Sequence, residues 1–221
     1  MHEKNAIQLA VQRGHEDQRG SAVSSQDGRA TAELVSLLSL EQPPTRIECY
    51  DISHTQGESA VGSRVVFING KPAPHLYRKF NIRTVQGIDD YASLAEVLER
   101  RFLRSWVNGE GGQVDREDPW AIPDLVVIDG GPGQLNAAIK GMSKAMIYPS
   151  IVTSDTKVPR RAIVPICSLA KNQEEVFVQG RSSPVNQSPD SPALLLLRSL
   201  RDESHRFALR AHRQRRSILN S

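Results

Sequence analysis

The sequence predicts an α/β fold in which one mixed sheet is flanked by helices, and two observations carry this prediction. The first half holds three β-prone runs, and Asn69-Gly70, a strong hairpin signal, separates the last two of them. In the second half, short apolar runs alternate with segments of helical periodicity, which is typical of parallel strands connected by helices. We therefore expect a sheet that begins with antiparallel strands and continues with parallel ones.

Residues 1–44 are expected to form a helical lead-in to this domain. Two pieces, 5–12 and 31–40, carry apolar residues at helical spacing. Pro43-Pro44 ends the lead-in, because neither residue can continue a helix. We expect the lead-in to pack on the domain, and a free linker is the alternative.

The three strands of the antiparallel part are expected at Arg46–Ser53, Ser63–Ile68 and Leu76–Phe80. Gly57 separates the first two, and Asn69-Gly70 separates the second from the third. Short turn signals between apolar runs favour neighbouring antiparallel strands, so these three strands are predicted to form a meander.

The second half is expected to alternate helices and strands within a domain that spans 45–216 and leaves 217–221 as a tail. The helices are predicted over 89–106 and 134–146, and the strands over 124–128, 163–168 and 175–178. A last helix opens at Ser191-Pro192, where serine suits the N-cap and proline the first turn, and runs to about Arg215. This order of elements is expected of a ribonuclease-H-like fold.

Composition excludes several classes of protein. A hydrophobic fraction of 38% and a charged fraction of 24% are typical of a globular domain, and no run reaches the roughly 18 apolar residues of a membrane span. The first residues do not resemble a secretory signal. Cys49 and Cys167 lie in apolar strand-like runs, so we expect buried free thiols and not a disulfide scaffold.

Two aspartates are candidate metal ligands because each follows an apolar, β-prone run. Asp51 ends the first run, and Asp129 follows Leu125–Ile128. A carboxylate at the C-terminal edge of a buried strand is where α/β proteins place ligand-binding groups, and Gly130-Gly131 lets the backbone approach a charged ligand. The ordinary alternatives are a strand-end polar residue and an Asp-capped turn.

His205 and a basic stripe lie on the predicted last helix. Between Arg198 and Arg216 the chain has seven arginines against two acids, which indicates contact with nucleic-acid phosphates; a solvated helix face is the alternative. Two carboxylates with an imidazole suit phosphodiester hydrolysis assisted by Mg²⁺ or Mn²⁺, because hard cations prefer oxygen ligands and Mn²⁺ tolerates imidazole.

Three strings of residues carry a resemblance to a known family: Tyr50–His54, Ile128–Leu135 and Arg201–Ala208. With their flanks they resemble the C-terminal endonuclease half of UvrC, a subunit of bacterial nucleotide excision repair, from about Arg46 to Arg216. The resemblance implies a ribonuclease-H-like fold and a metal-dependent DNA endonuclease that cuts on the 5′ side of a lesion. It also implies a UvrB-type partner, and a bacterial cytoplasmic location or an organelle in a eukaryotic homologue.

The resemblance further implies roles for individual residues. Asp51, Asp129 and His205 match the catalytic, metal-binding positions, with His205 as ligand or proton carrier. Lys171, Arg198, Arg201 and Arg206 are expected to contact DNA, and a solvated lysine is the alternative for Lys171. His54, Gly130 and Gly131 are expected to support the site, although His54 has the alternative of a local surface hydrogen bond.

The chain also departs from the family. Pro132 stands where most relatives have lysine, which removes one expected phosphate contact. The N-terminal nuclease half, the UvrB-docking segment and the helix-hairpin-helix tail of the family do not fit in 221 residues, so we expect a fragment or a stand-alone homologue. The rival functions are a catalytically weakened nucleic-acid-binding homologue and an RNA-directed nuclease of the same fold.

Overall fold

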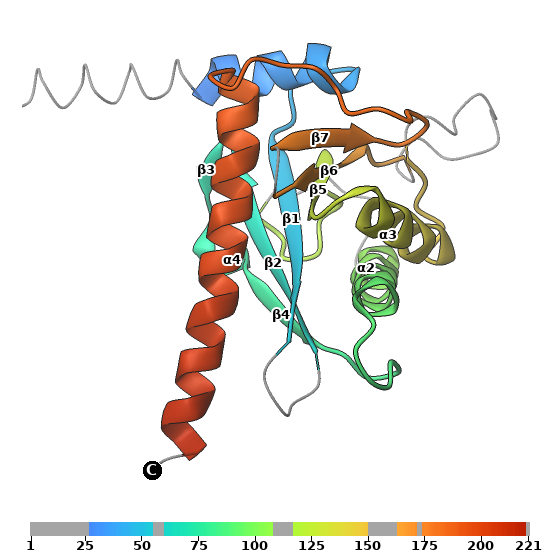
Figure 1. Cartoon of the computed structure of the whole chain (residues 1–221), viewed down its shortest axis with the longest axis vertical. Helices are drawn as coiled ribbons and strands as arrows, with labels where there is room; N and C mark the ends of the chain where they lie inside the picture. The colour runs from blue at the N-terminus through green and yellow to red at the C-terminus, as the bar shows by residue number, and fades with distance from the viewer. Residues whose placement is uncertain (1–26, 55–59, 108–116, 150–162, 172–173, 220–221) are drawn as a thin grey trace, which may run out of the picture.

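A seven-stranded mixed sheet with helices on both faces forms the centre of the molecule (Figure 1). The computed structural model describes residues 27–54, 60–107, 117–149, 163–171 and 174–219, and their side chains except at 106–107 and 211–219. The strand order is β3-β2-β1-β5-β6-β7, and β4 pairs with β2 beside this path. The predicted helix over residues 5–12 and the separator Gly57 lie outside the described residues.

The antiparallel part of the sheet confirms the predicted meander. Strand β1 (Arg46–Ser53) pairs along its whole length with β2 (Val61–Ile68). Asn69 and Gly70 both have positive φ, 51° and 77°, as the primed hairpin turns require, and the turn leads into the short β3 (Lys71–Pro72).

The predicted strand over 76–80 is partly wrong at its start. Residues Pro74–Leu76 form the 3-10 helix η1, and β4 covers only Arg78–Asn81. Pro74 occupies the first turn of η1, where its fixed φ favours a helical start over an extended strand.

The parallel part places β5 (Leu125–Asp129) between β1 and β6 (Ile166–Ala170), with β7 (Glu175–Val178) antiparallel at the edge. The predicted strand over 163–168 begins late, at Ile166. Pro165 has no N–H to donate to the ladder, so the residues before it make only an isolated bridge, between Ile163 and Tyr148.

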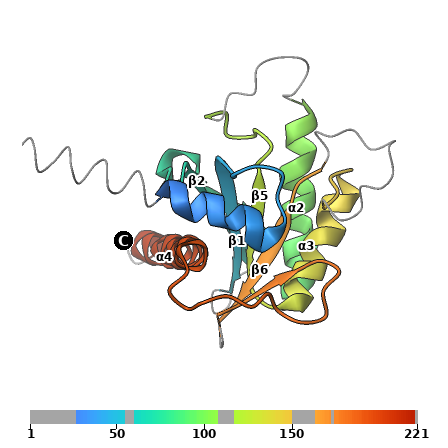
Figure 2. The ribbon, with the colours of Figure 1, turned by 90° about the horizontal axis from the view of Figure 1, so that it is seen from above.

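The helices form two layers (Figures 1 and 2). Helices α2 (Asp90–Val107) and α3 (Pro132–Lys144) cover one face, while α4 (Pro192–Leu219) and a helix over residues 27–38 cover the other. Helix α3 starts two residues earlier than predicted because Pro132 takes the N1 position.

Strand alternation sorts the core into two clusters. Ile47, Cys49 and Val127 face the α4 side, where they pack with the α4 leucines, whereas Tyr50 and Ile128 face α2 and α3. Leu34, in the helix over residues 27–38, is fully buried in the α4-side cluster. That helix therefore packs on the core and is not a free linker.

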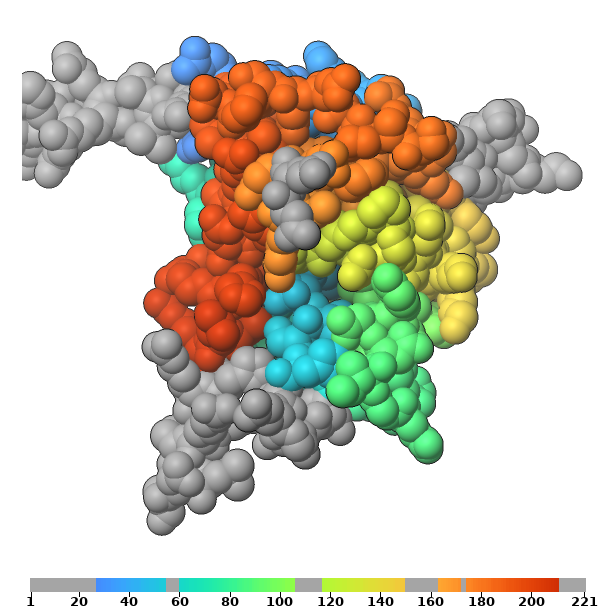
Figure 3. Space-filling view, viewed as in Figure 1, coloured from blue at the N-terminus to red at the C-terminus, as the bar shows by residue number. Residues whose placement is uncertain are grey.

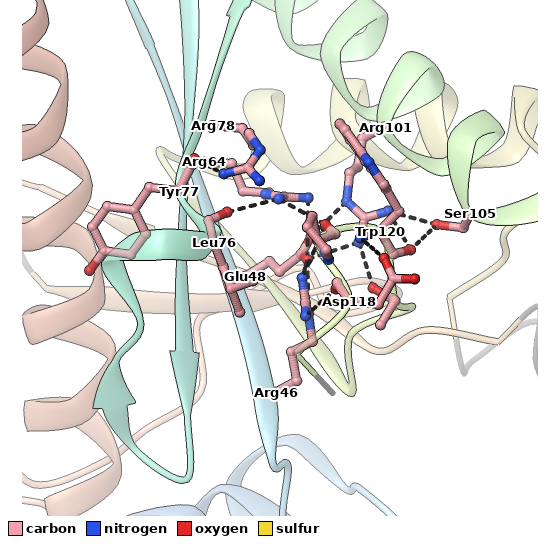
Figure 4. A network of polar contacts seen from close by, with 12 residues as sticks. Arg46, Glu48, Arg64, Leu76, Tyr77, Arg78, Arg101, Ser105, Asp118 and Trp120 are labelled. Atoms are coloured by element: carbon pink, nitrogen blue, oxygen red, sulfur yellow. Dashed lines mark hydrogen bonds and ion pairs between the residues drawn. The ribbon is translucent and has the colours of Figure 1, made fainter. Parts of the chain in front are cut away.

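A buried charge network, which the sequence did not predict, lies on the α2 side of the sheet (Figure 4). The Glu48 carboxylate is fully buried and accepts hydrogen bonds from Arg46, Arg101 and Tyr50, while Arg64 Nη1 lies 3.5 Å away. Burial raises the pKa of Glu48, but Arg101, Arg64 and Arg46 together outweigh burial and hold it well below its ordinary value.

The same arginines fasten the segment before β5. Arg46 donates to the Asp118 carbonyl, Arg64 to that of Pro119, and Arg101 to those of Trp120 and Ala121. Glu48 thus joins β1 to this segment through the arginines.

The two cysteines are free and buried, as the sequence predicted. Among the described residues, no helix combines the length and apolar character that crossing a membrane needs.

Candidate active site at the strand ends

The sheet register places the two candidate metal ligands side by side. Tyr50 on β1 pairs in parallel with Ile128 on β5, so Asp51 and Asp129 are the next residues on neighbouring strands, which lie roughly 4.8 Å apart. Both side chains point to the α4 face, two residues beyond Cys49 and Val127. In the space-filling view, the cyan surface of β1 and β2 lies between α4 and α2 (Figure 3).

Asp51 is a strongly perturbed carboxyl. Only 7% of the residue is exposed, and Ser53 Oγ donates to its Oδ2 over 3.3 Å. Burial, followed by the negative charge of Asp129, raises the pKa of Asp51 to about 6, against smaller opposing effects of Lys171 and His205. Asp51 therefore gains or loses its proton near neutral pH.

The buried carboxylate of Asp129 is the second perturbed acid of the site. Its side chain is fully buried, and neither carboxylate oxygen accepts a hydrogen bond from the described residues. Lys171 Nζ forms an ion pair at 3.5 Å from Oδ2. Burial raises the pKa of Asp129, while Lys171, Arg201 and His205 oppose the rise. Buried acceptors without donors are rare in folded proteins. The carboxylates of Asp51 and Asp129 are therefore suited to bind a metal cation.

His205 lies at the rim of this site. The residue is exposed, and it is near enough to oppose the rise in pKa of both aspartates. Its neighbour Ser204 is fully buried instead, with Oγ 3.3 Å from Ser63 Oγ, and Ser63 is the strand partner of Asp51. Helix α4 thus crosses the sheet at the carboxylates with Ser204 facing inward.

The described part of the chain does not assemble a three-ligand cluster. Within it, no group of three or more His, Cys, Asp and Glu side chains is arranged to hold a metal ion. The structure therefore brings Asp51 and Asp129 together with His205 beside them, and the role of His205 as a metal ligand stays a prediction.

The three arginines expected to contact DNA are all paired with acids of the same chain. Arg198 Nε and Arg201 Nη1 lie 3.0 and 2.8 Å from the same Glu174 oxygen. Arg206 pairs with Glu203, one turn earlier on α4. A phosphate that binds these arginines therefore competes with internal carboxylates.

His54 forms a local surface contact, the alternative that the sequence left open. Its Nε2 contacts Oδ1 of Asp90, the first residue of α2, and both side chains are partly exposed. The adjacent Asp89 Oδ1 accepts a hydrogen bond from the Ala92 N–H at 2.9 Å, so Asp89 caps α2.

The Gly130-Gly131 turn before α3 is in contact with Gln134, a residue of the first turn of that helix. The Gly131 N–H donates to Gln134 Oε1 at 3.1 Å, and a Cβ at Gly130 would lie 2.8 Å from Gln134 Cγ. The turn therefore needs glycine for close packing, and the Gly131 N–H is engaged by Gln134.

Tyr91 on α2 contacts the first turn of α3. It is 52% exposed, and a Cβ at Gly133 would lie 2.7 Å from its hydroxyl oxygen. Glycine at position 133, in the first turn of α3, is the signal that indicates a close neighbour.

Asp51→Asn is expected to stabilise the metal-free protein at neutral pH. Because the folded pKa is raised to about 6 from 3.8, the stability that Asp51 contributes is full below about pH 4 and is lost as pH rises through 6. Asparagine does not titrate, so its stability relative to the parent should increase by roughly 2 kcal/mol between pH 4.5 and 7.5.

Urea unfolding in EDTA at the two pH values measures this difference, with Asp190→Asn at an exposed aspartate as control. A parent-to-variant difference that is the same at both pH values would contradict the perturbed titration of Asp51.

Comparisons with known proteins bear on this site. The family model for the UvrC RNAse H endonuclease domain matches residues 35–209. UvrABC system protein C of Cyanothece sp. is 44% identical over 203 residues, with 90% of this chain and 30% of the relative covered. The protein of the same name from Desulforudis audaxviator is 40% identical over 220 residues, with 97% of this chain and 34% of the relative covered.

The chain spans about a third or less of the length of these curated relatives. Among solved structures, Ciona intestinalis endonuclease V in complex with an inosine-containing 23mer DNA covers 72% of this chain and 59% of its own, at 12% identity and a TM-score of 0.36.

Proposed function

The chain belongs to the family of the UvrC RNAse H endonuclease domain, and we propose that it is a metal-dependent DNA endonuclease of nucleotide excision repair. The observation that carries the proposal is the buried pair of Asp51 and Asp129: the strand register puts the two carboxylates side by side, and the Asp129 oxygens accept no hydrogen bond from any described residue. The proposed reaction is hydrolysis of a phosphodiester bond on the 5′ side of a lesion.

Asp51 and Asp129 would hold a divalent cation, Mg²⁺ or Mn²⁺. When bound, the cation supplies an activated water and stabilises the charge that develops on the phosphate oxygens. Ser53 orients the Asp51 carboxylate through its hydrogen bond. In this proposal, the exposed imidazole of His205 takes or delivers a proton at the rim of the site.

The proposed DNA path follows α4. Arg198, Arg201 and Arg206 lie on this helix next to His205, and their acidic partners keep the guanidinium groups ordered before DNA arrives. The proposed partner is a UvrB-type protein and the proposed compartment the bacterial cytoplasm, both by membership of the family.

Glu174→Gln is expected to raise the affinity for duplex DNA several-fold, because the variant frees Arg198 and Arg201 from a competing carboxylate. Replacing Arg198, Arg201 and Arg206 together with alanine is expected to lower affinity and to flatten the slope of log affinity against log salt by about 0.9 for each lost phosphate contact.

Fluorescence anisotropy with a labelled duplex at several salt concentrations measures both effects. Glu175→Gln, at the next residue on β7, is the matched control for Glu174→Gln. Unchanged affinity and slope in the triple variant would show that the stripe is a solvated helix face.

The decisive test of the activity is nicking of supercoiled plasmid by the purified chain in Mn²⁺, with EDTA as the negative control. Duplex DNA and an RNA–DNA hybrid, compared under the same conditions, separate a DNA nuclease from an RNA-directed one. A 5′-labelled duplex with one bulky adduct, incubated with a UvrB-type partner, then locates the incision relative to the lesion.

A catalytically weakened nucleic-acid-binding homologue is the second candidate. It is favoured by the start of α3, where Pro132 has no N–H and the Gly131 N–H is already bonded to Gln134, so this turn offers fewer donors to a phosphate. DNA binding with no Mn²⁺-dependent nicking above the EDTA control would support this candidate over the endonuclease.

A further inference from the structure

Lys171 is an exposed lysine whose ammonium group forms an ion pair with a buried carboxylate of the site. Its Nζ lies 3.5 Å from Asp129 Oδ2, and the carboxylate it meets is fully buried, whereas 59% of the lysine side chain is exposed. The ammonium group therefore reaches inward from solvent to a buried anion.

The sheet explains how the lysine arrives there. Asp129 pairs with Leu169 on β6, and Lys171 follows two residues later, so alternation returns it to the side of the sheet that Asp129 faces. Arg201 and His205 also act on Asp129, and Arg201 is paired with Glu174 and Asp202. Lys171 is thus the cation of the described residues that forms an ion pair with Asp129.

We propose that Lys171 is a tethered counter-ion, which neutralises Asp129 while no metal is bound and is released to a DNA phosphate when a divalent cation takes its place. The inference rests on the proposed metal site at Asp51 and Asp129. It adds a competition that the family assignment does not contain, between an internal ammonium and the metal for the same oxygens.

The physical reason is charge balance in a buried place. Two neighbouring carboxylates without a cation repel one another, and an unpaired buried charge is costly. A lysine can relieve this cost and still leave easily, because its ammonium is strongly hydrated and its flexible stem is already half in water. A divalent cation replaces one positive charge with two, and the freed ammonium can then pair with an anionic ligand.

Mn²⁺ titration of the metal-free chain in the absence of DNA tests the competition, with free Mn²⁺ followed by electron paramagnetic resonance. Lys171→Met is expected to bind Mn²⁺ about tenfold more tightly than the parent, because the competing charge is gone. Lys171→Arg should bind Mn²⁺ with nearly the affinity of the parent, because it keeps the positive charge. Lys144→Met, at an exposed lysine 3.4 Å from Glu99, should leave affinity unchanged.

The release step has a separate readout. Adding Ca²⁺, which we expect to fill the site with little cleavage, should steepen the salt dependence of DNA binding by about 0.9 more in the parent than in Lys171→Met, because one more phosphate contact forms. Bound Ca²⁺ itself changes the salt dependence of DNA binding equally in both chains, so the difference between the two chains reports the contact made by Lys171.

Two results would overturn the inference. Equal or weaker Mn²⁺ affinity in Lys171→Met, with clear binding by the parent, would show that Lys171 does not compete, and the proposed function would survive. No Mn²⁺ binding by the parent and no nicking would remove the metal site, and the inference would fall with it.

Discussion

Asp51→Asn should reduce Mn²⁺-dependent plasmid nicking roughly a thousandfold or more, because a metal site supplies several kcal/mol of transition-state stabilisation. Asparagine keeps the shape of the side chain and can still accept the hydrogen bond from Ser53 Oγ. It loses the negative charge that, beside Asp129, would hold a divalent cation. The variant should therefore lose nicking activity and keep its fold.

Asp129→Asn should have an effect of the same order, and the double variant should be little worse than either single one, because the two carboxylates act as one unit. Initial nicking rates under enzyme excess measure the loss, and circular dichroism with urea unfolding checks the fold. Asp190→Asn is the control preparation. Activity of either variant within a few-fold of the parent would exclude that carboxylate as a required ligand.

Glu48→Gln should lower the free energy of unfolding by about 3–5 kcal/mol, the usual cost of breaking a buried ion pair by removing one partner. Glu48 is fully buried with Arg46, Arg64 and Arg101, so its loss leaves three buried guanidinium groups without their shared anion. Trp120 adds a weaker contact, with the Arg64 and Arg101 guanidinium carbons 5.3 and 5.7 Å from its ring centroid.

Urea unfolding at pH 7 measures this change, with Glu99→Gln as matched control. Glu99 pairs with Lys144 at the surface, where such a pair contributes about 0–1 kcal/mol. A double-mutant cycle with Arg101→Met isolates the pair itself. A loss below about 1 kcal/mol for Glu48→Gln would mean that the network contributes little to stability.

The local elements could be read from the sequence because each depends on residues close along the chain. Asn69-Gly70 fits its turn with positive φ at both residues, and the Leu194 N–H donates to Ser191 Oγ at 3.3 Å as an N-cap requires. Asp51 and Asp129 were candidates because each ends an apolar run. Errors fell at strand starts, where Pro74 and Pro165 locally outweighed the apolar pattern.

The sequence by itself indicated most of the strands and helices and made Asp51, Asp129 and His205 candidates for the site, because these inferences depend on short-range backbone preferences and alternation. The pairing of charges, in contrast, became visible in the folded chain. Glu174 binds Arg198 and Arg201, Lys171 reaches Asp129, and Arg101 meets Glu48 across 53 positions of sequence. Such pairings depend on strand register and helix packing, which bring distant residues within a few ångströms and leave no trace in local spacing.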